Sequence, residues 1–353
     1  MSGGPVPPLR LGLIGCGAIA FWVHLRNLRR MRDVVLVAAA DPDEAARART
    51  ASLTPAHLVA EPAAVLERTD IEAVLIAAPT ELHAELAVAA ARSGKHVYLE
   101  KPVATDWAGA RRVEEAVAAA GVTAVMGFNR RFHPAHRRAR ELIVGGRIGR
   151  VRVVQSIFAE AAAGALPVWK TRRESGGGVL LDLASHHFDL LRWMLGAEAV
   201  SVKARTWSEA TAQDTAAVWL SFDSGVEAHG YFSFHSGVAD HLEFFGDSGR
   251  IRVDRHATAP ELWLSRRLGY GVRRSRVSMP VVDQLGRIRR WMRPAEDPSY
   301  FRALRAFVAR VRGATDDSAT LGDGARSLDL VLAAEVSASA DTTVSLPPIP
   351  RRG

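Results

Sequence analysis

Cysteine is nearly absent from this sequence, since Cys16 is the single thiol in 353 residues. One thiol excludes an intramolecular disulfide and is typical of a reducing compartment. No apolar run approaches the roughly 18 residues of a membrane-spanning helix, and the first residues, MSGGPVPPLR, lack the apolar centre of a secretory signal. We therefore expect a cytoplasmic protein.

Acidic and aromatic residues are also scarce in one part of the chain. Overall, 46 basic side chains stand against 38 acidic ones, and nine arginines with the single acid Asp283 lie between Trp263 and Pro294. This Arg-rich segment, 266–293, is compatible with a phosphate-bearing substrate or a nucleic acid. Few aromatic residues are present there to stack bases, so a solvated face or a subunit contact is the favoured interpretation.

Length and composition predict two folded domains. A chain of 353 residues, 48% hydrophobic and 24% charged, exceeds the size at which one core usually keeps growing. In the first part, short apolar runs alternate with alanine-rich helical stretches, which favours a doubly wound parallel α/β sheet. The expected strands are 9–15, 34–40, 73–78, 96–99 and 123–128, and the expected helices are 18–31, 43–52, 61–68, 83–93 and 106–120.

The first expected strand leads into GCGAIA, which has the G-x-G-x-x-G/A spacing. Gly15 permits a tight turn, Gly17 lets the backbone approach a pyrophosphate, and the small Ala20 lets the helix pack on the strand. The helix N-terminus favours the anion. Because the motif follows a strand and precedes a helix, it predicts a dinucleotide held by Gly15, Gly17, Ala18, Ile19 and Ala20.

Asp41 ends the second expected strand, about 20 residues after the glycine loop. A carboxylate there accepts hydrogen bonds from the adenosine ribose and repels a 2′-phosphate, which favours NAD over NADP. The alternative interpretation of Asp41 is a strand-end turn with Pro42. NADP stays open as a second cofactor, because Arg47 lies close enough in sequence to accommodate the extra phosphate.

Two further strand ends carry polar residues, in AAPTELH and YLEKP. Ligands of open α/β sheets bind at the carboxyl ends of the strands, so both loops are expected to border the cofactor. A lysine at a strand end is poorly explained by packing, although a surface ion pair with Glu100 is the plainer alternative. The expected cofactor contacts from these loops are Ala78, Pro79, Thr80, His83, Glu100 and Lys101.

After a helix expected over 129–143, the pattern changes to that of a mostly antiparallel sheet. The expected strands are 151–160, 200–207, 216–222, 226–236, 241–246 and 250–254, followed by helices over 300–311 and 324–340. We expect a disordered tail over 1–8, a nucleotide-binding domain over 9–128 and a second α+β domain over 129–345. The helix 324–340 has a small-residue face suited to packing back on the first domain, and the last residues, PPIPRRG, are expected to be disordered.

The stretch GGGVLLDLASHHFDLL, 176–191, places charged groups in an otherwise apolar helix. In a regular α-helix Asp182, His186 and Asp189 share one face, while His187 points about a quarter-turn away. Burying an unpaired charge is expensive, so the stripe pairs internally, binds a metal or faces a ligand. A metal is disfavoured because nothing else nearby has ligand spacing, and Asp189 is expected to pair with a buried partner.

These motifs together resemble the glucose-fructose oxidoreductase, inositol dehydrogenase and MocA (Gfo/Idh/MocA) family of NAD(P)-dependent enzymes. The likeness covers nearly the whole chain, and the matching segments, in order, are GCGAIA, ADPD, APTELH, YLEKP, GFNRRFHP, SGGGVLLDLASHHFDLL and FFGDSGRIRVD. It implies an N-terminal Rossmann domain and a C-terminal domain whose large open sheet often joins dimers or tetramers. It also implies a cis Lys101–Pro102 peptide bond.

The resemblance further implies that Lys101, Asp182 and His186 converge on a substrate alcohol beside the nicotinamide. Histidine suits the general base, the aspartate can orient the imidazole or bind a neighbouring hydroxyl, and the lysine can stabilise charge on the reacting oxygen. Weaker predicted substrate contacts are Asn129, Arg130 and Trp169. His24 either approaches the nicotinamide end or serves packing.

The leading hypothesis is an NAD-dependent oxidoreductase of a sugar, cyclitol or related polyol that forms a homodimer or homotetramer and has no resident metal or membrane partner. A second class among the relatives of this family is the redox-neutral glycosidase that binds NAD. A third is a cofactor-binding sensor without turnover, against which stands the intact Lys101, Asp182 and His186 set. Nucleic-acid binding by the Arg-rich segment is the weakest interpretation.

Overall fold

The computed structural model describes residues 7–162, 166–256, 261–268, 271–277 and 297–347. The chain divides into two compact units, the first of residues 1–129 with 293–325 and the second of 130–292 with 326–353. Residues 1–6 and 348–353, for which disorder is expected, lie outside the described residues, as does the 278–293 part of the Arg-rich segment. In the described ranges no helix is both long and apolar enough to cross a membrane.

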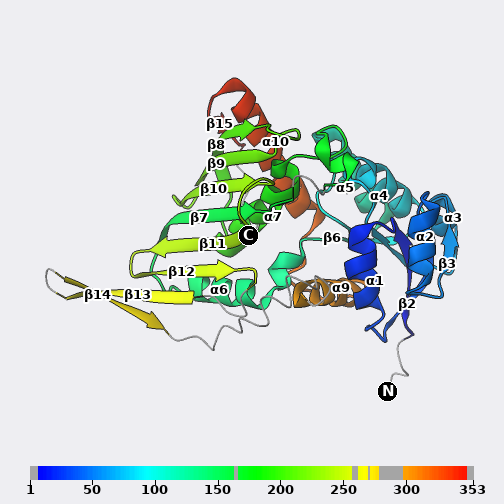
Figure 1. Cartoon of the computed structure of the whole chain (residues 1–353). Helices are drawn as coiled ribbons and strands as arrows, with labels where there is room; N and C mark the ends of the chain where they lie inside the picture. The colour runs from blue at the N-terminus through cyan, green and yellow to red at the C-terminus, as the bar shows by residue number, and fades with distance from the viewer. Residues whose placement is uncertain (1–6, 163–165, 257–260, 269–270, 278–296, 348–353) are drawn as a thin grey trace, which may run out of the picture. The chain divides into compact units, whose positions relative to one another are not determined.

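The first unit contains a parallel sheet with the strand order β3-β2-β1-β4-β5-β6 (Figure 1). This is the order of a Rossmann domain, in which the order of the strands reverses between β1 and β4 while all strands stay parallel. The predicted doubly wound sheet is therefore confirmed. Its strands are β1 (Leu9–Ile14), β2 (Val34–Ala40), β3 (His57–Val59), β4 (Ala73–Ile76), β5 (His96–Leu99) and β6 (Ala124–Met126). Strand β3 is not expected from the sequence because it is three residues long and none of them is buried.

Helices of the first unit begin where short polar side chains cap them. Asp43, Asp106 and Asp297 each accept a backbone N–H from the first turn that follows. The helices are η1 (Ala20–His24), α1 (Leu25–Leu28), α2 (Glu44–Ala51), α3 (Ala63–Leu66), η2 (Thr80–Leu82), α4 (His83–Arg92), α5 (Trp107–Ala120) and α9 (Pro298–Val311). The five helices expected before residue 121 are all present, and the first of them starts with the π-helical turn η1.

The second unit is built on a sheet whose order in the described residues is β14-β13-β12-β11-β7-β10-β9-β8-β15. Its neighbours pair antiparallel except β7 with β10, which are parallel, so the expected mostly antiparallel sheet is confirmed. The strands are β7 (Val151–Ala159), β8 (Ala199–Trp207), β9 (Thr215–Phe222), β10 (Glu227–Ser233), β11 (Ala239–Gly246), β12 (Gly249–Asp254), β13 (Glu261–Leu268), β14 (Gly271–Val277) and β15 (Val344–Ser345).

Among the described residues, helices pack on one face of this sheet. Phe232 of β10 packs against Phe188 of helix α7 (Ser185–Leu195), and Ala204 of β8 donates its N–H to Ser337 of helix α10 (Leu321–Ala340). The alternate residues of the strands point to the opposite face. That face exposes large aromatic side chains.

One helix differs from expectation. The helix expected over 129–143 is two, η3 (Asn129–Phe132) and α6 (Pro134–Val144), because Pro134 takes the first position of α6 and lacks an N–H to continue η3. The segment 324–340, for which we expect packing on the Rossmann domain, is α10. From residue 326 onward it belongs to the second unit, and α9 belongs to the first.

Candidate functional site

The glycine loop after β1 has two positions with different requirements. Gly15 has a φ of +93°, and a Cβ there would lie 2.5 Å from the carbonyl oxygen of Ala77, so only glycine fits. A Cβ on Gly17 would meet nothing within 4 Å. The backbone at Gly17 therefore borders open space, as the approach of a pyrophosphate requires.

Asp41 is bonded to this loop. Its Oδ2 accepts the N–H of Cys16 at 2.7 Å, and its Oδ1 accepts the N–H of Asp43 at 2.9 Å. Each carboxylate oxygen has capacity for a further hydrogen bond, and the side chain is partly exposed. The turn role and the ribose role considered for Asp41 are thus compatible, and the residues present fit a dinucleotide. Arg47 lies beside them, with Nη1 2.7 Å from the carbonyl oxygen of Asp41.

Cys16 is a small buried side chain inside the loop. Burial raises the pKa of its thiol to about 11, so the thiol stays neutral at physiological pH. A packing role follows for this residue.

His83 connects the two loops that carry the other predicted cofactor contacts. Its Nδ1 lies 2.6 Å from the Pro102 carbonyl oxygen and its Nε2 lies 2.9 Å from that of Ala78. Burial lowers the pKa of His83, and the two carbonyl groups oppose that shift. The Lys101–Pro102 peptide bond is cis, as the family resemblance implies. His83 therefore holds the Lys101 loop against the end of β4.

Glu100 and His24 form a buried pair under the same loop. His24 Nε2 lies 2.8 Å from Glu100 Oε1, and the Lys101 N–H donates to Glu100 Oε2 at 3.3 Å. The His24 ring also makes an edge contact with Tyr98, with centroids 5.9 Å apart. Of the two roles considered for His24, this geometry supports packing. Thr80 is also buried, while Pro79 and Lys101 are half-buried.

In the second unit, Asp182 is part of a small polar cluster. Lys170 Nζ donates to Asp182 Oδ2 at 2.6 Å and lies 5.4 Å from the centroid of the Trp169 ring. The two charged side chains are partly exposed, at 26% for Lys170 and 13% for Asp182. The pair is not evident from the sequence because a loop separates the two residues.

The helix that contains Asp182 and His186 is irregular. Residues Leu180–Ala184 form a π-helical turn, η6, and α7 begins directly after it. His186 is nearly buried, with its ring 6.4 Å from that of Phe158. The expected stripe of three groups along one regular helix face is therefore changed, because the helix widens at Asp182.

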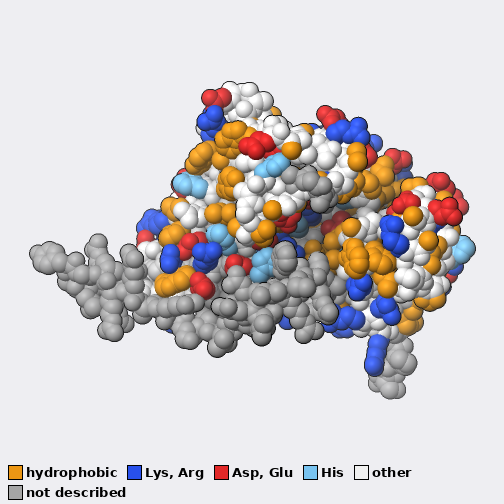
Figure 2. Space-filling model, in the orientation of Figure 1, with side chains coloured by type: hydrophobic (Ala, Val, Ile, Leu, Met, Phe, Trp, Pro, Cys, Tyr) orange, Lys and Arg blue, Asp and Glu red, His pale blue; other side chains and the backbone are white. Residues whose placement is uncertain are grey.

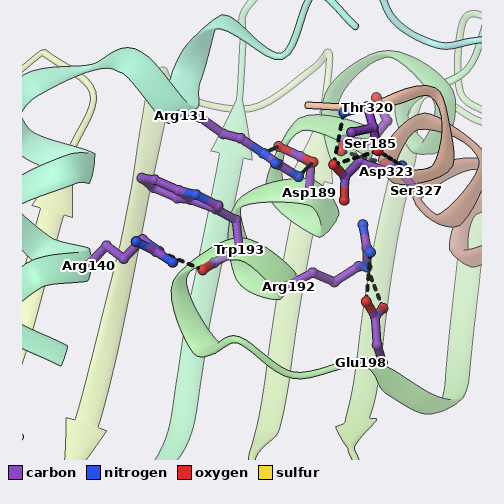
Figure 3. A network of polar contacts seen from close by, with 10 residues as sticks. All are labelled: Arg131, Arg140, Ser185, Asp189, Arg192, Trp193, Glu198, Thr320, Asp323 and Ser327. Atoms are coloured by element: carbon purple, nitrogen blue, oxygen red, sulfur yellow. Dashed lines mark hydrogen bonds and ion pairs between the residues drawn. The ribbon is translucent and has the colours of Figure 1, made fainter. Parts of the chain in front are cut away.

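Asp189, the third member of that stripe, points to a different partner. Arg131 Nε donates to Asp189 Oδ2 at 2.9 Å, and both side chains are buried (Figure 3). The expected buried partner of Asp189 is thus Arg131. Among the described residues no three His, Cys, Asp or Glu side chains are grouped to hold a metal ion.

Two of the predicted substrate contacts are buried and hydrogen-bonded. Asn129 Nδ2 donates to Ser299 Oγ at 2.7 Å within the first unit. Arg130 Nη1 donates to Asp240 Oδ1 at 2.7 Å within the second, and its guanidinium lies 4.1 Å from the centroid of the Phe158 ring. Trp169, the third predicted contact, is half-buried. No spacing in the sequence identifies Asp240 as the partner of Arg130.

Glu160 is a candidate residue of the functional site that the sequence analysis does not identify. Ser156 and Phe158 of β7 both contact His187, so strand alternation directs Glu160, the next residue of that set, to the same face. Burial raises the pKa of Glu160, and the charge of Asp182 raises it further, although nearby Arg255 and Lys170 oppose this. In the sequence, Glu160 could have been found by extending the alternate-residue pattern of Ser156 and Phe158 one step beyond the end of β7.

Comparison with known proteins gives matches in both units. A family profile described as the oxidoreductase family, NAD-binding Rossmann fold, matches residues 9–128, and one described as the GFO/IDH/MocA C-terminal domain matches residues 136–252. Myo-inositol 2-dehydrogenase of Thermotoga maritima is 29% identical over 348 residues, covering 96% of this chain and 98% of its own. The dTDP-3,4-didehydro-2,6-dideoxy-alpha-D-glucose 3-reductase of Saccharopolyspora spinosa is 30% identical over 334 residues, covering 91% and 93%.

A solved structure is similar over the same length. The putative myo-inositol dehydrogenase from Sinorhizobium meliloti 1021 is 28% identical, with a TM-score of 0.77, and the match covers 96% of this chain and 100% of that one. On the face shown in Figure 2, basic and acidic side chains of the described residues are interspersed. Because both domain profiles match in chain order and full-length relatives align with nearly the whole sequence, the chain belongs to the GFO/IDH/MocA family and is an NAD-binding oxidoreductase.

Proposed function

We propose that the chain transfers a hydride between NAD and a secondary alcohol or ketone of a sugar, cyclitol or related polyol. The observation that carries this proposal is the helical segment that contains both Asp182 and the nearly buried His186. The same chain has a glycine loop after β1 that is bonded to Asp41 and fits a dinucleotide. The names of the two full-length relatives, one an inositol dehydrogenase and the other a reductase of a dTDP-linked deoxysugar, support this substrate class.

In this proposal His186 is the general base. When bound, NAD provides the hydride acceptor at the nicotinamide ring. An imidazole nitrogen of His186 takes the proton of the substrate hydroxyl in oxidation and returns it in reduction, a role that histidine commonly has in enzymes. Lys101 donates a hydrogen bond to the reacting oxygen and stabilises its developing charge. Asp182, held by Lys170 at 2.6 Å, binds a neighbouring hydroxyl or orients the imidazole.

Trp169 is the best supported of the predicted substrate contacts. Its ring is partly exposed next to Lys170, and an aromatic face together with charged groups suits the recognition of a ring bearing hydroxyls. We propose that Asn129 and Arg130 shape the site from the interior, because their polar atoms bond Ser299 and Asp240.

We also propose that the face of the second unit's sheet opposite α7 and α10 joins copies of this chain. Trp207 of β8, Trp219 of β9 and Tyr231 of β10 all point to that face and are 42%, 42% and 37% exposed. A row of exposed aromatic side chains is typical of an interface. Light scattering should show a dimer or tetramer for the wild type and a smaller species for Trp219→Glu. The control is Trp22→Glu, which changes an exposed tryptophan of the first unit.

The test of the reaction is NADH formation on a panel of inositols, free sugars, sugar phosphates and nucleotide sugars. Wild type, His186→Ala and the control His57→Ala, which changes an exposed histidine of β3 in the first unit, are compared. Loss of His186 should lower turnover by about 10² to 10⁴-fold and leave NAD affinity unchanged. Release of free sugar without net NADH would favour the redox-neutral glycosidase, and tight NAD binding without any turnover would favour a sensor.

A further inference from the structure

Ser185 sits at the junction of the two kinds of helix that carry Asp182 and His186. Its N–H donates to the carbonyl of Leu180, five residues back, whereas a regular α-helix would direct it to Leu181, four residues back. The chain therefore gains one residue in the turn between Asp182 and His186.

In the wider turn the Leu181 carbonyl does not receive the N–H of Ser185, and the hydroxyl of Ser185 donates to it instead. Its Oγ donates to the Leu181 carbonyl at 2.6 Å, and the residue is 1% exposed. A buried carbonyl without a partner is costly, so a π-helical turn at this place needs a second donor. Ser185 meets the need by serving two successive carbonyls, Leu180 with its N–H and Leu181 with its hydroxyl.

A second buried serine fixes Ser185 from the neighbouring helix. Ser327 Oγ of α10 donates to the carbonyl oxygen of Ser185 at 2.8 Å (Figure 3). The backbone of Ser185 is thus tied to an element outside its own helix, and the turn before it has to accommodate that fixed point.

We propose that Ser185 is a positioning residue whose hydroxyl maintains the π-helical turn and thereby sets the direction of Asp182 relative to His186. A shift of one residue in helix register turns a side chain by about 100°. Conversion of the turn to regular α-helix would therefore move the Asp182 side chain away from Lys170. It would also change the orientation of Asp182 relative to His186. The consequence for turnover rests on the proposed function, whereas the consequence for the helix does not.

The test compares Ser185→Ala with Ser185→Thr, which keeps the hydroxyl, and with Ser337→Ala. Ser337 is a matched control because it is a fully buried serine of α10 whose Oγ also bonds backbone groups, among them the Ala204 N–H at 2.9 Å. Crystal structures of the variants show which carbonyl accepts the N–H of residue 185. Steady-state kinetics on the best polyol of the panel give kcat and KM, and fluorescence titration gives the Kd of NADH.

We expect the N–H of residue 185 to move to Leu181 in Ser185→Ala, with kcat lower by about 10²-fold and the Kd of NADH unchanged. Ser185→Thr should recover most of the kcat, and Ser337→Ala should keep it. A Ser185→Ala structure that retains the bond to Leu180 would overturn the proposal, as would an equal loss of kcat in Ser337→Ala or no recovery with threonine.

Failure of the proposed function and failure of the variant to fold can both be distinguished from failure of this proposal. If wild type transfers no hydride with any polyol, the proposed function fails, and the crystal structures still decide whether Ser185 sets the turn. If Ser185→Ala does not fold, Ser185→Cys, with a thiol that is a weaker donor, replaces it in both measurements.

Discussion

Arg130 and Asp240 form an ion pair in the interior of the second unit, with Nη1 and Oδ1 2.7 Å apart and side chains 3% and 4% exposed. His187 Nε2 lies 3.0 Å from the same oxygen. Burial alone would raise the pKa of Asp240, but the charge of Arg130 and the contact with His187 hold it well below its ordinary value. The carboxylate is therefore charged at physiological pH, and it anchors α7, the helix of His186, to strand β11.

Removing the charge of Asp240 should destabilise the fold. Asp240→Asn leaves Arg130 buried without its counter-charge, so the free energy of unfolding should fall by about 3–5 kcal/mol. Urea unfolding measures it. The control is Asp247→Asn, which breaks the Arg152–Asp247 pair on the surface and should have no measurable effect. Equal effects of the two variants would show that the buried pair does not stabilise the unit.

Buried histidines should make stability depend on pH. Burial lowers the pKa of His136 and of His187 below the ordinary value of 6.5, and both rings are completely buried in the second unit. A lowered folded pKa contributes stability that is complete above the unfolded pKa and is lost as pH falls through the folded pKa.

The free energy of unfolding should therefore decrease from about pH 7 to about pH 5, because these histidines bind protons in the unfolded chain and stay neutral in the folded chain. Urea unfolding of wild type and His136→Asn at both pH values tests this, and the variant should show a shallower decrease. His57→Asn, at an exposed position of the first unit, should keep the wild-type dependence. A wild-type stability that rises toward pH 5 would contradict the expectation.

The parts of the fold that the sequence predicts are those with a strong local pattern. Strands β2 and β5 have the expected bounds because continuous apolar runs of a parallel sheet end abruptly at polar residues. Strands β13 and β14 are not expected, because arginines interrupt the apolar alternation in that segment. Strand β15, two residues long, has no pattern to detect.

The candidate site is predictable only in part for a related reason. Asp41 and the glycine loop lie where the strand–turn–helix pattern puts them, because their geometry is local. The bonds Lys170–Asp182, Arg131–Asp189 and Ser327–Ser185 join residues that are distant in sequence, so no spacing encodes them. A regular helix is the only expectation the sequence offers at Asp182, where the structure has a π-helical turn.

The two glycines of the loop after β1 should differ in what alanine does to them. Gly15→Ala forces a Cβ to within 2.5 Å of the Ala77 carbonyl oxygen at a φ of +93°, so the free energy of unfolding should fall by at least about 1–2 kcal/mol. Gly17→Ala meets no atom within 4 Å, so the fold should keep its stability.

NAD affinity should nevertheless fall in Gly17→Ala, because the methyl group enters the space that the pyrophosphate needs. Thermal unfolding without cofactor and calorimetric titration with NAD separate the two effects. Gly121→Ala, at a glycine with a φ of +65° and open space around it, controls for backbone strain away from the loop. Unchanged NAD affinity in Gly17→Ala would place the pyrophosphate elsewhere.

Asp41 should determine the choice between NAD and NADP. Asp41→Ser removes the charge that repels a 2′-phosphate, and Arg47, whose Nη1 lies 2.7 Å from the Asp41 carbonyl oxygen, is close enough to attract one. The ratio of kcat/KM for NADP to that for NAD should rise by about 10-fold or more, which corresponds to about 1.4 kcal/mol. Adding Arg47→Met should reverse most of the gain.

Asp43→Ser is the control, because this carboxylate caps α2 by accepting the Ala45 N–H, so its loss should leave the ratio unchanged. If Asp41→Ser and Asp43→Ser behave alike, the ribose is not recognised through Asp41, and its carboxylate serves only the turn with Cys16 and Asp43.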